Sequence, residues 1–159
     1  MKETLFDTLS PYLSEIEEEM RSLLAQRDPS LGPFYGPMRY HLGWVDGEFR
    51  PAEAHPGKRI RPLLCLLVKE AISGDYRVAL PAAAAVELLH NFSLIHDDIE
   101  DGSPRRRGRA TVWWLWGQPQ AINVGDGLLV LSHLALQRLA ERRVDPETIS
   151  QALQILDEA

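Results

Sequence analysis

Apolar residues recur along much of the chain at steps of three and four, a spacing that places them on one face of an α-helix. The first such stretch covers residues 3–26, with apolar side chains at Leu5, Leu9, Tyr12, Leu13, Ile16, Met20, Leu23 and Leu24. We therefore expect an amphipathic helix here. The acidic run at 15–19 is interpreted as the solvated face of this helix and is given no function.

Proline and glycine interrupt this pattern twice. Residues 27–37 hold Pro29, Gly32, Pro33, Gly36 and Pro37, which predicts a loop, with a short helix after it at 37–44. Residues 45–57 are predicted to form a second loop for the same reason. The helical pattern resumes after GKRIRP, residues 57–62, where Pro62 suits the first turn of a helix and Gly74 suits its end.

The most apolar stretch starts at Pro81, passes through four alanines and continues to Ile95. Alanine is the best helix former, and the apolar surface is broad enough for a helix that is buried on most sides. Further on, TVWWLW at Thr111–Trp116 could form a strand, but no partner strand is evident in the sequence. We interpret it as packing, or as part of a wall around an apolar ligand.

Two more helices are expected in the last quarter of the chain. One runs from Pro119 to about Arg143 and carries Asp126 between two glycines. The other begins at Asp145-Pro146, a typical N-cap and first-turn pair, and continues to about residue 158. Together these elements predict an all-α fold, a helical bundle.

Length and composition exclude several classes of protein. The 159 residues allow one ordinary domain with a core, and the net charge of -6 argues against general nucleic-acid binding. Cys65 is the only cysteine, which fits a reducing compartment. No run reaches the roughly 18 apolar residues of a membrane span, and the acidic N-terminus is unlike a signal peptide. We expect a cytoplasmic protein without a membrane span.

Opposite charges concentrate where the apolar stretch ends. Four carboxylates are followed, after a Gly-Ser-Pro break, by four arginines: Asp97, Asp98, Glu100 and Asp101, then Arg105, Arg106, Arg107 and Arg109. Carboxylates are disfavoured at a helix C-terminus, and two of them about 6 Å apart repel by roughly 3 kcal/mol at an effective dielectric near 20. Mg2+ relieves this conflict, because it binds carboxylates together with phosphate oxygens, and guanidinium groups bind phosphate bidentately. The pattern predicts a magnesium-diphosphate site; a solvated acidic patch beside a basic loop is the alternative.

Polar residues on the apolar helix extend this site. Steps of three and four residues keep one helix face polar, at His90, Ser93, Asp97 and Asp101. A lone histidine on such a helix is more often a satisfied core residue. Its position two turns before the aspartates favours a role in the site instead.

A second basic cluster stands at GKRIRP. Lys58, Arg59 and Arg61 lie at the start of a predicted helix, where free N–H groups and the helix dipole attract anions. Taken alone, this cluster is more often a charged loop that keeps the helix end soluble.

GKRIRP, HNFSLIHDDIED and RRRGRATVW, in this order and spacing, resemble the trans-isoprenyl diphosphate synthases, or polyprenyl synthetases. The DDxxD element alone would also suit a class I terpene cyclase-like protein, but those enzymes lack the other two elements. The resemblance implies an all-α bundle of the isoprenoid synthase type, usually a homodimer. Its members join isopentenyl diphosphate head-to-tail to an allylic diphosphate (dimethylallyl, geranyl or farnesyl) and depend on Mg2+.

The resemblance also implies a role for each matching residue. The expected metal ligands are Asp97 and Asp101, supported by Asp98, and Arg106 is expected to hold the allylic diphosphate; these four form the catalytic set. Isopentenyl diphosphate is expected at Lys58, Arg61, His90 and Arg107. In the family, an aromatic five residues before the first aspartate resembles a floor that stops chain elongation. Phe92, with Ser93 beside it, therefore implies a short product, farnesyl or geranylgeranyl diphosphate.

The resemblance covers nearly the whole chain but only the N-terminal part of a single isoprenoid synthase domain. Family members are about twice as long and carry a second aspartate-rich motif, so we expect residues 1–159 alone not to turn over. Three interpretations follow: part of a synthase, a non-catalytic or regulatory small subunit of a heteromeric synthase, or a structural helical protein with a decayed site. The intact charge set argues against the last.

Overall fold

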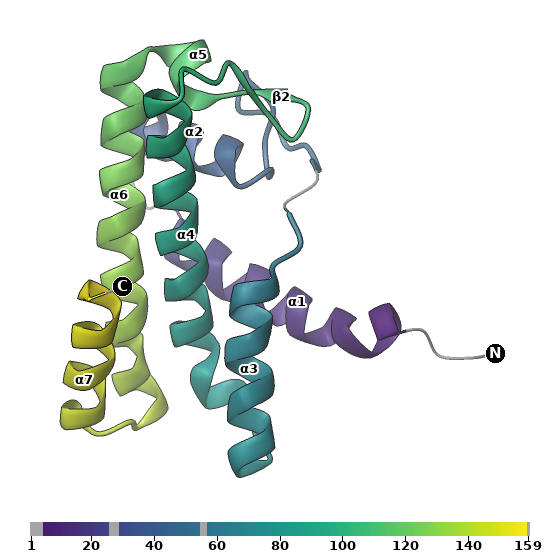
Figure 1. The fold of residues 1–159 in the computed structure, drawn as a ribbon, viewed down its shortest axis with the longest axis vertical. Coiled ribbons are helices and arrows are strands. Elements are labelled where there is room, and N and C mark those ends of the chain that lie inside the picture. Colours follow the sequence, from purple (N-terminus) through teal and green to yellow (C-terminus); the bar gives the residue numbers. More distant parts are fainter. Residues whose placement is uncertain (1–4, 26–28, 55–56, 159) are drawn as a thin grey trace. The chain divides into compact units, whose positions relative to one another are not determined.

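A computed structural model describes residues 5–25, 29–54 and 57–158 (Figure 1). Its helices are α1 Leu5–Leu23, α2 Gly32–His41, α3 Ile60–Ser73, α4 Leu80–Glu100, α5 Val112–Trp116, α6 Gln118–Gln137 and α7 Pro146–Asp157. Short 3-10 turns stand at Pro29–Leu31, Arg77–Ala79 and Arg138–Arg142, and two strands, β1 Arg105–Arg106 and β2 Arg109–Ala110, form an antiparallel hairpin. The predicted all-α class is therefore confirmed for the described residues.

The chain divides into two compact units. The first contains Met1–Leu23, Arg59–Glu87 and Leu131–Ala159, and the second contains Leu24–Lys58 and Leu88–Val130. Helices α4 and α6 each contribute residues to both units.

In the first unit, α1 packs against α3. Its core is built from the apolar faces that the sequence predicted, with Ile16 and Met20 of α1 and Leu66 of α3 fully buried. A buried ion-pair network accompanies this core and joins Arg59 to Glu17 and Glu87. Helix α7 begins as predicted, because the Asp145 side chain accepts a hydrogen bond from the backbone N–H of Thr148 at 2.9 Å.

In the second unit, side chains of α4 and α2 approach the backbone of α6 closely. A Cβ on Gly125 would overlap the ring of His96 on α4, and a Cβ on Gly127 would overlap the Met38 side chain on α2. Both neighbours can occupy this space only because α6 has no side chain at either position. Asp126 stands between the two glycines, and its Oδ1 lies 3.6 Å from Nε2 of His96.

A short helix is present as predicted, but its predicted bounds of 37–44 are wrong, as is the loop predicted as far as residue 37; residues 27 and 28 of that loop lie outside the described residues. Pro29–Leu31 forms a 3-10 turn, and an α-helix begins at Gly32 and ends at His41. Pro33 lies in the first turn, where its missing N–H has no consequence. Gly36 leaves room for the ring of Phe49, whose atoms would lie 2.8 Å from an added Cβ. Tertiary packing thus overrides the local preference for a loop.

The segment Thr111–Trp116 forms a five-residue helix, α5, preceded by the hairpin, which the sequence did not predict. The interpretation as packing is supported, since Trp116 meets Tyr40 edge-on with ring centroids 5.0 Å apart and stacks on Phe49 at 5.5 Å. The other helices match their predictions, including the end of α3 at Gly74, which has a left-handed φ of 74°.

By length and composition alone, Arg77–Glu100 is long and apolar enough to cross a membrane. More than half of the qualifying window is buried within the protein. A buried core helix passes the same test, so this is weak evidence against the prediction that the chain has no membrane span.

Candidate functional site

The aspartate-rich segment forms the last turn of α4 and the turn that follows it. Asp97 and Asp101 are exposed, whereas Asp98 is only 2% exposed. The N–H of Asp101 still donates to the Asp97 carbonyl at 2.8 Å, but Gly102 is left-handed with φ of 61°, and the N–H of Ser103 closes the helix end onto the Asp98 carbonyl at 2.9 Å. The helix end therefore holds the carboxylates of Asp97 and Asp101 in solvent and that of Asp98 inside.

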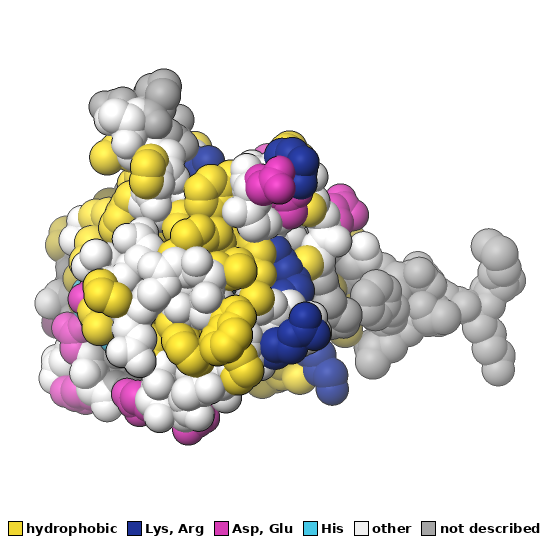
Figure 2. All heavy atoms as spheres, turned by 90° about the horizontal axis from the view of Figure 1, so that it is seen from above, with side chains coloured by type: hydrophobic (Ala, Val, Ile, Leu, Met, Phe, Trp, Pro, Cys, Tyr) yellow, Lys and Arg dark blue, Asp and Glu magenta, His cyan; other side chains and the backbone are white. Residues whose placement is uncertain are grey.

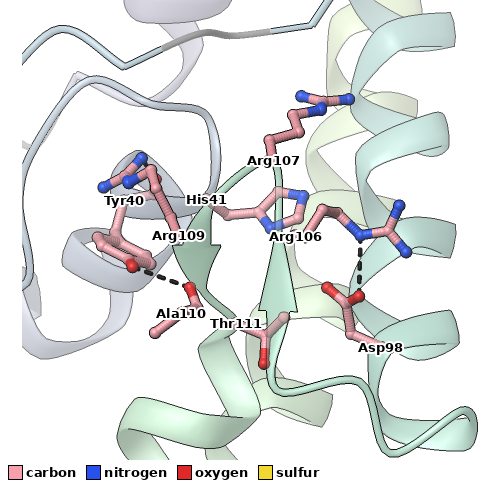
Figure 3. A pocket seen from close by; sticks show the side chains of 8 residues that line it. All are labelled: Tyr40, His41, Asp98, Arg106, Arg107, Arg109, Ala110 and Thr111. Atoms are coloured by element: carbon pink, nitrogen blue, oxygen red, sulfur yellow. Dashed lines mark hydrogen bonds and ion pairs between the residues drawn. The ribbon is translucent and has the colours of Figure 1, made fainter.

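Asp98 is paired with the hairpin. The Nε of Arg106 donates to its Oδ1 at 2.8 Å (Figure 3). Burial raises the pKa of the Asp98 carboxyl above its ordinary value, although the hydrogen bond from Arg106 acts in the opposite direction. Two residues that the sequence placed in one site are thus brought into direct contact.

The hairpin turn positions the next arginine. Arg107 and Gly108 link the strands with φ of 51° and 79°, the two positive values that a two-residue type I′ turn requires. The guanidinium of Arg107 then lies against Gly57, where an added Cβ would stand 2.7 Å from its Cζ. This contact brings the RRRGR segment next to the start of GKRIRP, as a shared anion site would require.

Arg109 has a different role from the one its sequence context indicated. Its two terminal nitrogens donate to the carbonyls of Tyr40 at 2.9 Å and Val45 at 2.7 Å, and its Cζ lies 4.0 Å from the Tyr40 ring centroid. The Tyr40 hydroxyl in turn donates to the Ala110 carbonyl at 2.8 Å. Arg109 therefore fixes the hairpin to α2 and does not belong with the arginines that are expected to bind phosphate.

A small cavity of about 30 Å³ lies between these groups (Figure 3). Its lining consists of Tyr40, His41, Asp98, Arg106, Arg107, Arg109, Ala110 and Thr111. A cavity of this size holds one or a few water molecules and is small for a diphosphate, so we expect the arginine side chains around it to move when a diphosphate binds. Tyr40 and His41 lie within the short helix predicted at 37–44 and were not expected at the site, because the charge pattern that predicted the site does not include them.

On the α4 face that precedes the aspartates, the residues expected to contribute to the site are half-buried. His90 and Ser93 are half-buried on α4, and the Ser93 hydroxyl donates to the His90 carbonyl at 2.8 Å. Phe92 is half-buried, and its ring centroid lies 4.6 Å from that of His96. An added Cβ on Gly125 would lie 3.6 Å from the Phe92 ring, which places this aromatic side chain beside α6.

GKRIRP does not form one basic cluster. Lys58 and Arg61 are exposed, as residues that bind a diphosphate should be, but Arg59 is 4% exposed and paired with two glutamates. Arg59 therefore takes part neither in an anion site nor in a solvated loop, the two alternatives left open for this cluster, whereas the roles expected of Lys58 and Arg61 stay predictions. Charge alone could not reveal this, because its partners stand far away in the sequence.

Within the described ranges, no group of three or more histidine, cysteine or acidic residues has the geometry of a protein-only metal site. The exposed carboxylates of Asp97 and Asp101 nevertheless fit Mg2+, which needs only one or two carboxylates when water and phosphate oxygens complete its coordination. Asp98 is less suited to this role while it holds Arg106.

Comparison with known proteins extends these observations. The chain is 44% identical over 121 residues to a (2E,6E)-farnesyl diphosphate synthase of Mycobacterium tuberculosis, covering 76% of this chain and 33% of that protein. It is 38% identical over 138 residues to a geranylgeranyl pyrophosphate synthase of Geoglobus acetivorans, covering 87% and 38%. The chain thus spans about a third of the length of these relatives.

Solved structures show the same fold. A polyprenyl synthetase from Streptomyces coelicolor A3(2) aligns with a TM-score of 0.83 and 36% identity, over 95% of this chain and 43% of that chain. A geranylgeranyl pyrophosphate synthetase from Pyrococcus horikoshii aligns with a TM-score of 0.80 and 34% identity, over 97% and 42%. The sequence profile of the polyprenyl synthetase family matches residues 44–159. The chain belongs to the polyprenyl synthetase family.

Proposed function

We propose that this chain carries the first aspartate-rich motif and the diphosphate-binding residues of a short-chain isoprenyl diphosphate synthase. One observation carries the proposal: the hairpin Arg105–Ala110 contacts both other motifs, through Arg106 on Asp98 and Arg107 against Gly57. Relatives named as farnesyl and geranylgeranyl diphosphate synthases support the same class of reaction.

The reaction joins two substrates of like charge. The C–O bond of the allylic diphosphate breaks, and its electron pair leaves with the diphosphate. The alkene of isopentenyl diphosphate attacks the resulting carbocation, a new C–C bond forms, and a proton is lost. The leaving diphosphate needs its charge neutralised, and Mg2+ held by Asp97 and Asp101 would supply most of that neutralisation.

The arginines and the other basic residues bind and separate the two substrates. Arg106 is assigned to the allylic diphosphate, because its side chain contacts Asp98 of the aspartate-rich segment. Isopentenyl diphosphate is assigned to a set of three cationic side chains and one histidine: Lys58, Arg61, His90 and Arg107. Bidentate guanidinium contacts suit the phosphate oxygens of both.

The product chain is proposed to be short. Its tail would extend from the aspartates along α4 toward Phe92, whose ring packs on His96 beside α6. Phe92→Ala removes this aromatic side chain and should lengthen the products of an active protein that contains this chain. An unchanged product distribution by chromatography would contradict the assignment.

We also propose that the protein forms a homodimer. Figure 2, which looks from above along the vertical axis of Figure 1, shows hydrophobic side chains gathered on the surface seen from there, and α6 carries further ones along its length. Along α6, apolar residues at spacings of eight and four are exposed: Ile122 at 44%, Val130 at 58% and Leu134 at 44%. An apolar helix face of this kind favours association with another chain. Light scattering coupled to size exclusion would give twice the chain mass if the proposal holds and a single chain mass if it fails.

Calorimetric titration of the chain with isopentenyl diphosphate and with inorganic diphosphate tests the proposed function. Isopentenyl diphosphate should bind, and Arg107→Ala should weaken its binding. Inorganic diphosphate should bind more tightly with Mg2+ present, and Asp97→Asn should abolish this gain while leaving metal-free binding intact. The absence of any binding, or a magnesium effect that survives Asp97→Asn, would contradict the proposal.

A further inference from the structure

Arg59 is buried at the centre of a basic segment. Its neighbour Lys58 and the nearby Arg61 are exposed, whereas Arg59 is 4% exposed and begins α3 as its N-cap residue. Its backbone is left-handed, with φ of 47° and ψ of 33°. A residue with a Cβ rarely adopts this conformation, and it persists only where the surrounding structure imposes it.

Two glutamates impose it here. The Nε of Arg59 donates to Oε1 of Glu17 on α1 at 2.8 Å, and Nη2 lies 2.7 Å from the same oxygen. On the other side, Nη1 donates to Oε1 of Glu87 on α4 at 2.6 Å. The planar guanidinium thus connects α1, the start of α3 and α4 within the first unit.

Stability alone does not account for such a network. Arg59 and Glu87 lie where water is largely excluded, with side chains 3% and 4% exposed. Burying this pair carries a desolvation penalty, and apolar side chains of similar volume often replace a buried ion pair without loss of stability. A charged network does provide direction, since a guanidinium held by two carboxylates has one orientation. The left-handed backbone at Arg59 sets the path of the chain on both sides of it.

We propose that Arg59 is a positioning residue for isopentenyl diphosphate, which it does not touch itself. By fixing the backbone at the start of α3, the contacts with Glu17 and Glu87 hold Lys58 and Arg61 in the orientation that binds the diphosphate. Glu87 also belongs to α4, the helix whose sequence includes His90 one turn later. This assignment rests on the proposed function.

Arg59→Lys tests the assignment. Lysine keeps the positive charge, but its one ammonium group replaces the planar guanidinium and its separate N–H donors, so it cannot hold both carboxylates in the same geometry. The matched control is Arg138→Lys. Arg138 pairs with the buried Glu19 at 2.8 Å, also in the first unit, but lies far from GKRIRP in the sequence.

Affinity for isopentenyl diphosphate is measured by calorimetry well below both melting temperatures, and hydrogen exchange is followed for the amides of 57–63. Arg59→Lys should weaken binding by about tenfold or more, the effect expected if a displaced Lys58 or Arg61 loses one charge-assisted hydrogen bond to the diphosphate, and should accelerate exchange in this segment. Arg138→Lys should leave both unchanged, even if its melting temperature falls as far. Glu87→Gln is the second variant should Arg59→Lys fail to fold, and it should act in the same direction.

The outcomes are distinguishable. If the unsubstituted chain binds isopentenyl diphosphate and Arg59→Lys binds it equally well, the positioning assignment is overturned and the proposed function stands. Equal losses of affinity in Arg59→Lys and Arg138→Lys would show a general effect of stability and would also overturn it. If the unsubstituted chain binds no isopentenyl diphosphate, the proposed function and this assignment fall together.

Discussion

Replacing Asp98 with asparagine should strengthen the binding of inorganic diphosphate in metal-free buffer. Without a ligand, Asp98 holds Arg106 through a 2.8 Å hydrogen bond. A diphosphate that uses Arg106 has to compete with this carboxylate. Asparagine keeps the size of the side chain and a hydrogen-bond acceptor but removes the charge, so Arg106 becomes easier to release.

The magnitude follows from the two kinds of hydrogen bond. A hydrogen bond to a charged group contributes about 1.5–3 kcal/mol net, and a neutral one about 0.5–1.5 kcal/mol. The difference, about 1–2 kcal/mol, corresponds to an increase in affinity of roughly 5- to 30-fold. Since Asp98 is only 2% exposed, little of this difference is lost to screening by water.

Calorimetric titration with inorganic diphosphate in the presence of a chelator measures the effect. Asp101→Asn is the matched control, because it removes the same charge from an exposed carboxylate of the same motif. It reports how much affinity is gained by reducing general repulsion alone. An Asp98→Asn affinity equal to that of the control, or lower than that of the unsubstituted chain, would refute the competition between Asp98 and the ligand.

Three further predictions concern residues around and outside this site. Arg109→Lys should lower the free energy of unfolding by about 1–3 kcal/mol, because hydrogen bonds to two carbonyls are lost; urea unfolding measures this. Diphosphate affinity, measured by calorimetry, should be unchanged, and a weaker affinity would show that Arg109 belongs to the anion site. Burial raises the pKa of the Cys65 thiol, so iodoacetamide at pH 8 should alkylate it more slowly in the folded chain than in urea; equal rates would contradict this. The hydrogen bonds from Thr148 lower the pKa of the Asp145 carboxyl. The Asp145 cap therefore stabilises α7 fully at pH values above the ordinary carboxyl pKa, and this stabilisation is lost as the pH falls through the lowered pKa of Asp145. The protection of the Thr148 amide, measured as its exchange rate relative to the intrinsic rate at each pH, should fall in that range in the unsubstituted chain and should show no such step in Asp145→Ala.

The amphipathic spacing was sufficient to predict most helices, because burial of one apolar face decides them. It failed at the start of α2, where the local signals of Pro33 and Gly36 favour a loop. The helix forms there because the ring of Phe49 occupies the space above Gly36. A contact between residues 13 positions apart leaves no local sequence pattern, so the start of α2 could not be predicted from the residues around it.

The sequence was sufficient to predict which residue types form the site, but not which way each side chain points. The charge pattern grouped Asp98 with Arg106, and the structure brings these two into contact, while the roles of Asp97, Asp98 and Arg106 stay predictions. Arg59 and Arg109 are chemically identical to their exposed neighbours, yet both turn inward. Their orientation depends on distant partners, Glu17 and Glu87 for one and the backbone of α2 and the loop after it for the other. The predicted cytoplasmic location and the roles of His90 and Phe92 stay predictions.

The two glycines that flank Asp126 also bear on how the second unit folds. Glycine inside a helix costs about 1 kcal/mol relative to alanine, so this part of α6 is a poor helix by itself. It becomes stable only when His96 of α4 and Met38 of α2 occupy the spaces the glycines leave. Formation of α6 and docking of its neighbours should therefore be a single cooperative event. The central amides of α6 should then exchange only when α2 and α4 separate from it, with no independent fraying of the helix between its ends.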